Sequence, residues 1–305
     1  MKLRNTFKTR ILGSAAGGGL PQWNCNCFNC KDVRSGKEHI LARSQSSIAV
    51  TTDNQKWVLL NASPDIRYQL NDLSKAYPIS TLRDNRFAGI ILVDSQIDHT
   101  TGLLIMREGE PLNIYCTKNV YKELTEDYPI VKLLSYYCGT NHHEIKMDNS
   151  FFQVSSIQDL EFKAVPLSGQ PPPYSSNRGR QQLGDNIGII VKHVNSDKYL
   201  FYAPGIGEIT DQIREIIVNA DLTLIDGTVW TSDEMISQGI SEKTSYEMGH
   251  LPNLETLEIL KEAPGRKGLI HINNTNPILN KDSLERSKLD RLGIFVSEDG
   301  MEFNV

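Results

Sequence analysis

The sequence predicts an α/β fold, and three observations support this class. Apolar runs typical of buried strands alternate with segments of helical periodicity along most of the 305 residues. Hydrophobic residues make up 39% of the chain and charged residues 23%, as in globular proteins. No apolar run approaches the ~20 residues that a membrane-spanning helix needs. A chain of this length can hold one large domain or two small ones.

The first half is predicted to be strand-rich, beginning with a strand at 8–14 and a glycine-rich loop at 17–19. The runs at 46–50 and 57–60 are separated by Thr52-Asp53-Asn54, which predicts a hairpin. Pro64 is expected at the start of a helix. The remaining elements expected here are strands at 88–93 and 112–116 and a helix at 120–135.

The second half continues the alternation of strands and helices. Strands are expected at 151–154, 162–165, 187–193, 199–203, 222–226 and 267–272, and helices at 210–219 and 253–261. The segment at about 168–184 is too rich in proline and polar residues for a regular element. We therefore expect a long exposed loop there, of the kind that often covers a site.

Charge and termini exclude several function classes. A net charge of −5 and a pI near 5.8 give no electrostatic reason to expect a nucleic-acid partner. The basic residues 1–10 lead into a Gly/Ala-rich loop in place of an apolar signal core, which favours the cytoplasm. The loop at 17–19 matches neither a dinucleotide-binding pattern nor a Walker pattern, so nucleotide binding is not expected.

The stretch from Leu92 to Gly102 carries the main chemical signal. It follows an apolar run and precedes another, so its polar residues lie on a strand-to-helix turn. The adjacent Asp98 and His99 can face one ion, and their donor types suit Zn, Fe or Mn. The alternative is an aspartate that caps the helix beside an unrelated histidine.

A second signal is the cluster Cys25-x-Cys27-x-x-Cys30 in the loop at about 17–45. Three thiolates within six residues can wrap one side of a tetrahedral zinc ion, so a structural Zn(II) is expected. The alternative is a set of inert buried thiols. Cys116 and Cys138 have no such context and are taken as ordinary core or strand-end residues.

Four segments together resemble the coenzyme PQQ synthesis protein B family of the metallo-β-lactamase superfamily. These are 11–30, 94–102, 184–188 and 270–277. The superfamily loop His-x-His-x-Asp-His-x-x-Gly is matched at Asp98, His99 and Gly102, while Asp94 and Gln96 replace its leading histidines. The resemblance implies one domain over 1–305, a metallo-β-lactamase-type four-layer αββα sandwich with two mixed β-sheets.

The resemblance also implies an active-site metal, with Asp98, His99 and His271 as its ligands. Such a set leaves positions open, as expected of a non-haem Fe(II) centre that binds O2 beside an organic substrate. The other superfamily metal site has Asp94, Gln96 and Ser168 in place of histidines, and its bridging aspartate is missing near 202–204. We expect these three residues to contact substrate or support the ion, with Asp94 open as a direct ligand.

Further roles are implied for residues that lie outside this set. His250 is either an acid/base group or a helix cap, and Asp226 either orients a ligand imidazole or caps a turn. Asn274 stands where related phosphodiesterases have the fourth zinc ligand, so that ligand is left open. Arg178 and Arg180 are expected to bind carboxylates of an acidic substrate. The remaining histidines, His39, His142, His143 and His193, are assigned no role, with 142–143 in a polar loop.

The resemblance implies a role in pyrroloquinoline quinone (PQQ) biosynthesis. The expected reaction is Fe(II)- and O2-dependent hydroxylation of the tyrosine ring in the cross-linked Glu-Tyr precursor. Two alternatives stay open: a metal-dependent hydrolase of the same fold, and a non-catalytic carrier that moves PQQ or its precursor to the periplasm. Expected partners are that precursor, other proteins of the pathway and a second copy in a homodimer. The native metal and the electron source are left open.

Overall fold

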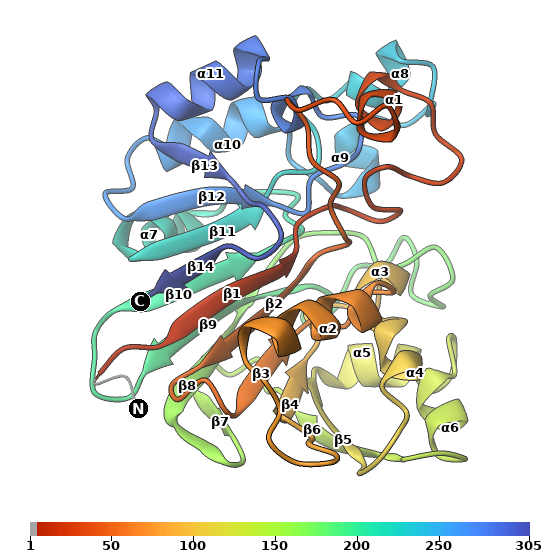
Figure 1. Cartoon of the computed structure of the whole chain (residues 1–305), viewed down its shortest axis with the longest axis vertical. Coiled ribbons are helices and arrows are strands. Elements are labelled where there is room, and N and C mark those ends of the chain that lie inside the picture. The colour runs from red at the N-terminus through yellow and green to blue at the C-terminus, as the bar shows by residue number, and fades with distance from the viewer. Residues whose placement is uncertain (1–4) are drawn as a thin grey trace.

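Two seven-stranded sheets form the centre of the computed structural model, which describes residues 5–305 (Figure 1). The first sheet has the order β14 (Glu302–Asn304), β1 (Lys8–Gly13), β2 (Ser47–Thr51), β3 (Trp57–Leu60), β4 (Phe87–Ile91), β5 (Leu112–Cys116), β6 (Thr140–Glu144). The second has the order β13 (Ile294–Val296), β12 (Arg266–Ile270), β11 (Leu222–Asp226), β10 (Tyr199–Ala203), β9 (Ile187–His193), β8 (Ile157–Pro166), β7 (Phe152–Val154). Each sheet joins a parallel part to an antiparallel part, so both are mixed as expected.

Side-chain alternation along the strands explains why the sheets pack together. In β3, Val58 and Leu60 belong to the core cluster shared with the second sheet, while Trp57 and Leu59 face the helices outside. Leu200 and Leu222 meet the same inner cluster from the other side. The inner faces of both sheets therefore form one apolar core.

Helices cover both outer faces, which completes the four layers. The helices α2 (Ile66–Ala76), α4 (Gly102–Ile105), α5 (Lys118–Glu123) and α6 (Ile130–Leu134) cover the first sheet. The helices α1 (Phe28–Arg34), α7 (Asp211–Asn219), α10 (Asn253–Leu260) and α11 (Leu284–Arg291) cover the second sheet. Three further short helices are α3 (Ile97–Thr100), α8 (Glu234–Ser237) and α9 (Ser245–Met248), and a 3-10 turn spans Pro277–Leu279. The expected αββα sandwich is confirmed.

Two local expectations are wrong. The helix expected at 120–135 is two short helices, α5 and α6, because Pro129 cannot donate a backbone hydrogen bond and restricts the residue before it. The histidines expected in a solvated loop lie on the edge strand β6, where His142 stacks on Tyr121 at 3.7 Å between ring centroids. His143 stacks on Tyr115 at 4.3 Å. Aromatic packing therefore orders this polar strand.

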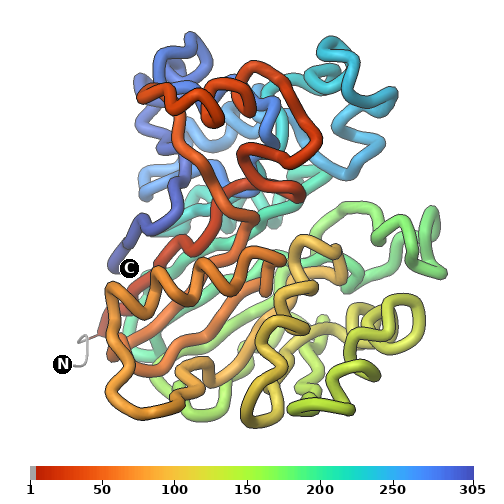
Figure 2. The backbone as a smooth tube through the Cα atoms, turned by 45° about the vertical axis from the view of Figure 1, so that its right-hand side comes forward, coloured from red at the N-terminus to blue at the C-terminus, as the bar shows by residue number. Residues whose placement is uncertain are grey.

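The loops that carry the candidate residues meet at one edge of the sandwich. They follow the carboxyl ends of β4, β11 and β12, which are parallel strands in their sheets. The N-terminal segment, red in Figure 2, crosses to the blue C-terminal half, and Ala16 N donates to Ile272 O at 2.9 Å. Within residues 5–305, no helix has the length and apolar character required to cross a bilayer.

Candidate metal centre

The turn after β4 is fixed against the segment that follows β3. Gly102 N donates to Ala62 O at 2.9 Å, and Ala62 N donates to His99 O at 2.7 Å. A Cβ on Gly102 would lie 2.3 Å from Ser63 O, so only glycine permits this approach. The close contact places α3 at the edge of a cavity that Asp98 and His99 line.

His99 is oriented by a carboxylate on its far ring nitrogen. Its Nδ1 lies 2.8 Å from Asp94 Oδ1, and because a carboxylate accepts, the proton is on Nδ1. Its Nε2 is buried, lacks a hydrogen-bond partner, and lies 3.8 Å from Asp98 Oδ2. Nε2 therefore faces Asp98 and is open to a proton or to a metal ion. Asp94, which the sequence left open as a direct ligand, supports the imidazole from behind through Oδ1.

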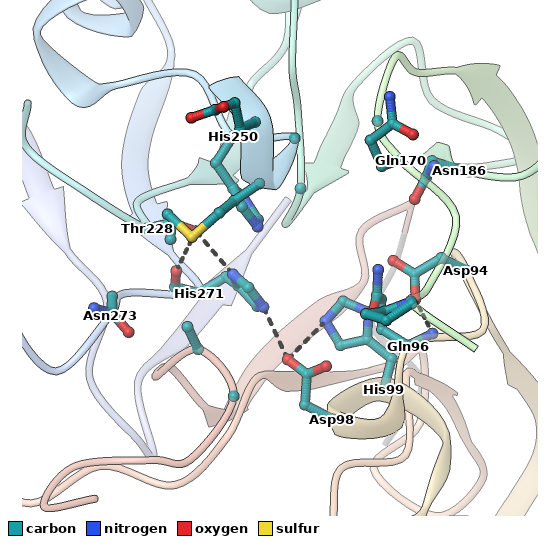
Figure 3. A pocket seen from close by; sticks show the side chains of 18 of the residues that line it. Asp94, Gln96, Asp98, His99, Gln170, Asn186, Thr228, His250, His271 and Asn273 are labelled. Carbon is teal, nitrogen blue, oxygen red and sulfur yellow. Dashed lines mark hydrogen bonds and ion pairs between the residues drawn. The ribbon is translucent and has the colours of Figure 1, made fainter. Parts of the chain in front are cut away.

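His271 follows β12 with a φ of 59°, in the left-handed region that non-glycine residues seldom adopt. The turn is held by Ile272 N donating to Ser14 O at 3.0 Å and Asn273 N donating to Thr228 O at 3.0 Å. The His271 side chain reaches Asp98, with 3.1 Å between Nε2 and Oδ2 (Figure 3). Strain at this position is thus tied to the orientation of a candidate ligand.

Thr228 orients the imidazole of His271, as Asp94 orients that of His99. Its hydroxyl donates to Asp226 Oδ1 at 2.6 Å, which leaves the oxygen lone pairs free to accept. Thr228 Oγ1 lies 3.0 Å from His271 Nδ1 and accepts its proton. A metal ion beside Asp98 would then take the lone pair of His271 Nε2 in place of the hydrogen bond to that carboxylate. Asp226 therefore acts on this candidate ligand through Thr228.

The donor atoms of Asp98, His99 and His271 lie within 4.8 Å of one another. Although burial disfavours a charged imidazole, the carboxylates of Asp94 and Asp98 raise the pKa of His99 to about 9. Burial likewise opposes ionisation of Asp98, yet His99 and His271 hold the pKa of that carboxyl well below its usual range. An orphaned buried nitrogen beside an ionised carboxylate fits a bound cation, so the residues present suit a metal ion.

His250 makes a separate pair with a buried carboxylate. Its Nδ1 lies 2.6 Å from Asp226 Oδ2, and Asp226 is fully buried. Despite burial, the charge of Asp226 raises the pKa of His250. Asp226, His250 and His271 also offer donor atoms within 4.8 Å of one another, but Nδ1 of His250 is committed to the carboxylate. This geometry favours the acid/base role for His250 over the helix cap.

The cavity beside these groups has a volume of about 370 Å³. Of the residues expected to touch substrate, Asp94, Gln96, His250 and Arg178 line it. Ser168 and Arg180 do not line it: Ser168 Oγ is buried without a partner, and Arg180 donates to Ser176 O at 3.2 Å. The structure thus divides the expected set into residues on the cavity and residues behind or beside it.

Several lining residues were missed in the sequence. These are Thr228, Lys243, Asn273, Gln170, Asn186, Met235 and Met248. Thr228 follows Asp226 by two positions at the end of a strand, which is a usable signal. Lys243 has none, because its loop reaches the cavity only through tertiary packing.

The cysteine cluster lies beside the same C-terminal segment. The sulfurs of Cys25, Cys27 and Cys30 lie within 4.8 Å of one another. Asn274 faces them, with Nδ2 3.2 Å from Cys30 Sγ and 3.6 Å from Cys27 Sγ. Three clustered sulfurs suit zinc, and the amide of Asn274 occupies the fourth side.

Glu123 in α5 links the turn after β4 to the proline-rich loop. Glu123, only 1% exposed, accepts hydrogen bonds from Ser95 Oγ and Ser175 Oγ. Tyr174 OH donates to Ser95 O. One carboxylate therefore joins the turn that carries Asp94 to the proline-rich loop at about 168–184.

Comparison with known proteins agrees with this geometry. Residues 56–272 match the beta-lactamase superfamily domain, and the fold is that of metal-dependent enzymes. "Coenzyme PQQ synthesis protein B" of Methylococcus capsulatus is 47% identical over 298 residues, covering 96% of this chain and 98% of that protein. The chain therefore belongs to the coenzyme PQQ synthesis protein B family.

Two solved structures share the fold of this chain. Zn(2+)-bound PqqB from Methylobacterium extorquens superposes with a TM-score of 0.88 at 32% identity, covering 98% of this chain and 100% of that one. A diphosphatase of the PhnP family has a TM-score of 0.70 at 17% identity, covering 100% of this chain and 98% of that one. The second likeness concerns the fold alone.

Proposed function

We propose that this protein acts in PQQ biosynthesis as an Fe(II)- and O2-dependent hydroxylase of the tyrosine ring in the cross-linked Glu-Tyr precursor. The observation that carries the proposal is the convergence of one carboxylate and two imidazoles beside a cavity. Two histidines and one carboxylate are the donor set of non-haem Fe(II) oxygenases. The names of its relatives supply the pathway.

The positions at which this chain lacks the superfamily histidines argue against a two-metal hydrolase. A dinuclear hydrolase needs a second ion to hold the attacking and leaving oxygens. Here Asp94 Oδ1 already accepts hydrogen bonds from His99 Nδ1 and, at 2.9 Å, from Gln96 N. The side chain of Gln96 is a neutral amide. Ser168 does not reach the cavity lining. These positions offer little to a second cation.

The bound iron would supply O2 activation at Asp98, His99 and His271. In the overall reaction, a ring C–H becomes C–OH while O2 accepts two electrons and two protons from an external reductant, and its other oxygen leaves as water. His250, with Nδ1 held by Asp226, keeps Nε2 available to move a proton. Thr228 and Asp94 hold the imidazole orientations.

Two cations on the cavity suit the carboxylates of such a precursor. The Arg178 guanidinium is held by donating to Pro171 O, which fixes it at the cavity. Lys243 lines the same cavity and would pair with a second carboxylate. We therefore propose Arg178 and Lys243 as the substrate-binding pair, in place of the pair Arg178 and Arg180 expected from the sequence.

The test is incubation of the Fe(II)-loaded protein with synthetic cross-linked Glu-Tyr, a reductant and isotopically labelled O2. We expect one labelled oxygen in the ring for each turnover, and none with the zinc-loaded protein. Activity that persists with zinc and without O2 would identify a hydrolase. Tight binding of the precursor without oxygen uptake under any reductant would identify a carrier.

Substrate recognition is tested with matched variants. Replacing Lys243 or Arg178 with Met should raise KM by about tenfold or more, because each removes a charge-assisted contact. Arg180→Met is the control, since Arg180 lies off the cavity, and its KM should stay at the wild-type value. Equal KM values for all three variants would remove this part of the proposal.

A further inference from the structure

Asn273 lies two residues after His271 and lines the metal-site cavity with it (Figure 3). Its backbone is fixed, because its N donates to Thr228 O and its O accepts from Asn276 N, both at 3.0 Å. The side-chain Nδ2 donates to Thr275 Oγ1 at 2.6 Å. Within residues 5–305, no group donates to the side-chain Oδ1, which keeps accessible surface. The amide therefore presents an unpaired acceptor to the cavity.

The direction of the Thr275 hydroxyl decides this orientation. Thr275 Oγ1 lies 2.5 Å from Glu234 Oε1, and Trp230 N donates to Glu234 Oε2 at 2.6 Å. An ionised carboxylate can only accept, so Thr275 must donate to Glu234 and is left to accept from Asn273. The charge on Glu234 thus fixes which end of the Asn273 amide faces the cavity.

Glu234 is the first residue of α8 and is 5% exposed. Burial raises the pKa of Glu234 to about 7, with a further contribution from the charges of Asp233 and Glu285 and against its two hydrogen bonds. Glu285 of α11 and Cys27, which precedes α1, line one cavity with Glu234, and no lysine, arginine or histidine lines it. Lys288 Nζ instead lies 5.6 Å from the centroid of the neighbouring indole ring. Both charge states of Glu234 are therefore accessible near neutral pH.

Protonation of Glu234 reverses the direction of these hydrogen bonds. Trp230 N can only donate, so the added proton must lie on Glu234 Oε1 and be donated to Thr275 Oγ1. The Thr275 hydroxyl, which is 4% exposed, then needs an acceptor, because a buried donor without one is costly. A half turn of the Asn273 amide supplies Oδ1 as that acceptor. Nδ2 then faces the cavity as a donor.

We propose that Asn273 determines specificity by accepting a hydrogen bond from the phenol hydroxyl of the substrate, and that Glu234 and Thr275 are positioning residues that set its orientation. The inference rests on the proposed function for the identity of the substrate. Because Asn273 is two residues from a candidate metal ligand, it meets the part of the substrate nearest the metal, which in the proposed reaction is the tyrosine ring. With Glu234 ionised the cavity favours a donor at this point, and with Glu234 protonated it favours an acceptor.

The experiment measures, by calorimetry on the Fe(II)-loaded full chain without O2, the Kd of the synthetic precursor and of its phenol methyl ether, which accepts but cannot donate. Between pH 6 and pH 8 the preference for the phenol should rise at least about fivefold, the effect of one hydrogen bond. Glu234→Gln should lack this rise, because its amide must accept from Trp230 N and donate to Thr275, as the protonated acid does. Glu285→Gln is the charge-matched control, since Glu285 lines the same cavity without bonding Thr275, and its preference should still rise.

A measurement without substrate tests the orientation of the amide directly. In the zinc-loaded protein, the side-chain amide resonances of Asn273, identified by their loss in Asn273→Ser, should shift with a midpoint near pH 7. They should not do so in Glu234→Gln. Binding of both ligands with a preference that ignores pH, or an equal shift in Glu234→Gln, would overturn this inference and leave the proposed function standing. Failure of both ligands to bind would instead remove the proposed function, and the contact inferred from it.

Discussion

The two candidate metal sites share one segment of chain but differ in how their ligands are supported. His271 faces the first site, and Asn274, three residues later, faces the cysteines. In the first site each imidazole has its second nitrogen held, by Asp94 or Thr228. The cysteine sulfurs receive only weak contacts, such as Gln22 N to Cys30 Sγ at 3.4 Å.

This difference indicates a division of labour. Ligands oriented from behind and open to a cavity suit an ion that must keep vacant positions for reactants. A cluster closed by Asn274 suits an ion that holds the chain together. Because both metal sites contact residues 271–276, the cysteine site also positions the loop that carries His271. The following predictions separate these two roles.

The largest effect is expected from His271→Asn, which removes the imidazole while keeping a residue that tolerates the left-handed conformation. The active-site metal should be lost, and turnover should fall to the level of the metal-free protein. Metal analysis should still find the ion at the cysteines. A variant that retains both ions with full turnover would show that His271 is not a ligand.

Cys30→Ser should have the opposite pattern, with loss of the cysteine-bound metal and a lower melting temperature. At a metal concentration of 100 to 1,000 Kd, the lost stabilisation is about 3 to 4 kcal/mol. Cys138→Ser is the control, since Cys138 lies outside the cluster. An unchanged metal content in Cys30→Ser would mean that the cysteines hold no ion.

The layers of the fold could be predicted because most strands are marked in the sequence by a run of apolar residues. The apolar runs at 88–93 and 222–226 are bounded by polar turns, and both form strands within one residue or two of expectation. The segment 140–144 gave no such signal, because stacking of His142 and His143 on tyrosines replaces apolar burial there. The C-terminal strands β13 and β14 also went unpredicted.

The metal centre was predictable only in part. Asp98 and His99 are adjacent in sequence, and the resemblance to a family supplied His271. The supporting hydrogen bonds were not visible, because Thr228 meets His271 across 43 positions. Lys243 reaches the cavity through the packing of its loop, which local patterns do not encode. Arg180 was expected on the cavity from composition alone, and the fold turns it away.

Asp94→Asn should weaken active-site metal binding by about 10- to 100-fold, because it removes the charge that orients His99. Thr228→Val should have a smaller effect, since a neutral hydroxyl supports His271. Chelator competition measures both affinities. Stronger binding in Asp94→Asn than in wild type would contradict the role assigned to this carboxylate. The cysteine-bound ion should be unaffected in both variants.

The smallest effect concerns the link between the cavity turn and the proline-rich loop. Burial raises the pKa of Glu123, although Ser175 and Ser95 donate to it. A carboxyl with a raised pKa in the folded state stabilises fully below its unfolded pKa and loses that stabilisation as pH rises through the folded value. Wild type should therefore carry a desolvation cost at neutral and alkaline pH that Glu123→Gln lacks.

The melting temperature of Glu123→Gln relative to wild type should thus increase as the pH rises above about 4, the ordinary pKa of a glutamate. The neutral amide keeps an acceptor for one serine, so the variant should fold. Glu126→Gln provides the control, because Glu126 is exposed and lies 3.8 Å from Lys122 on the surface. Its difference from wild type should stay small across this range. A flat response for Glu123→Gln would mean that the buried carboxylate is compensated by its two serine donors, and that the loop is held equally well in either protonation state.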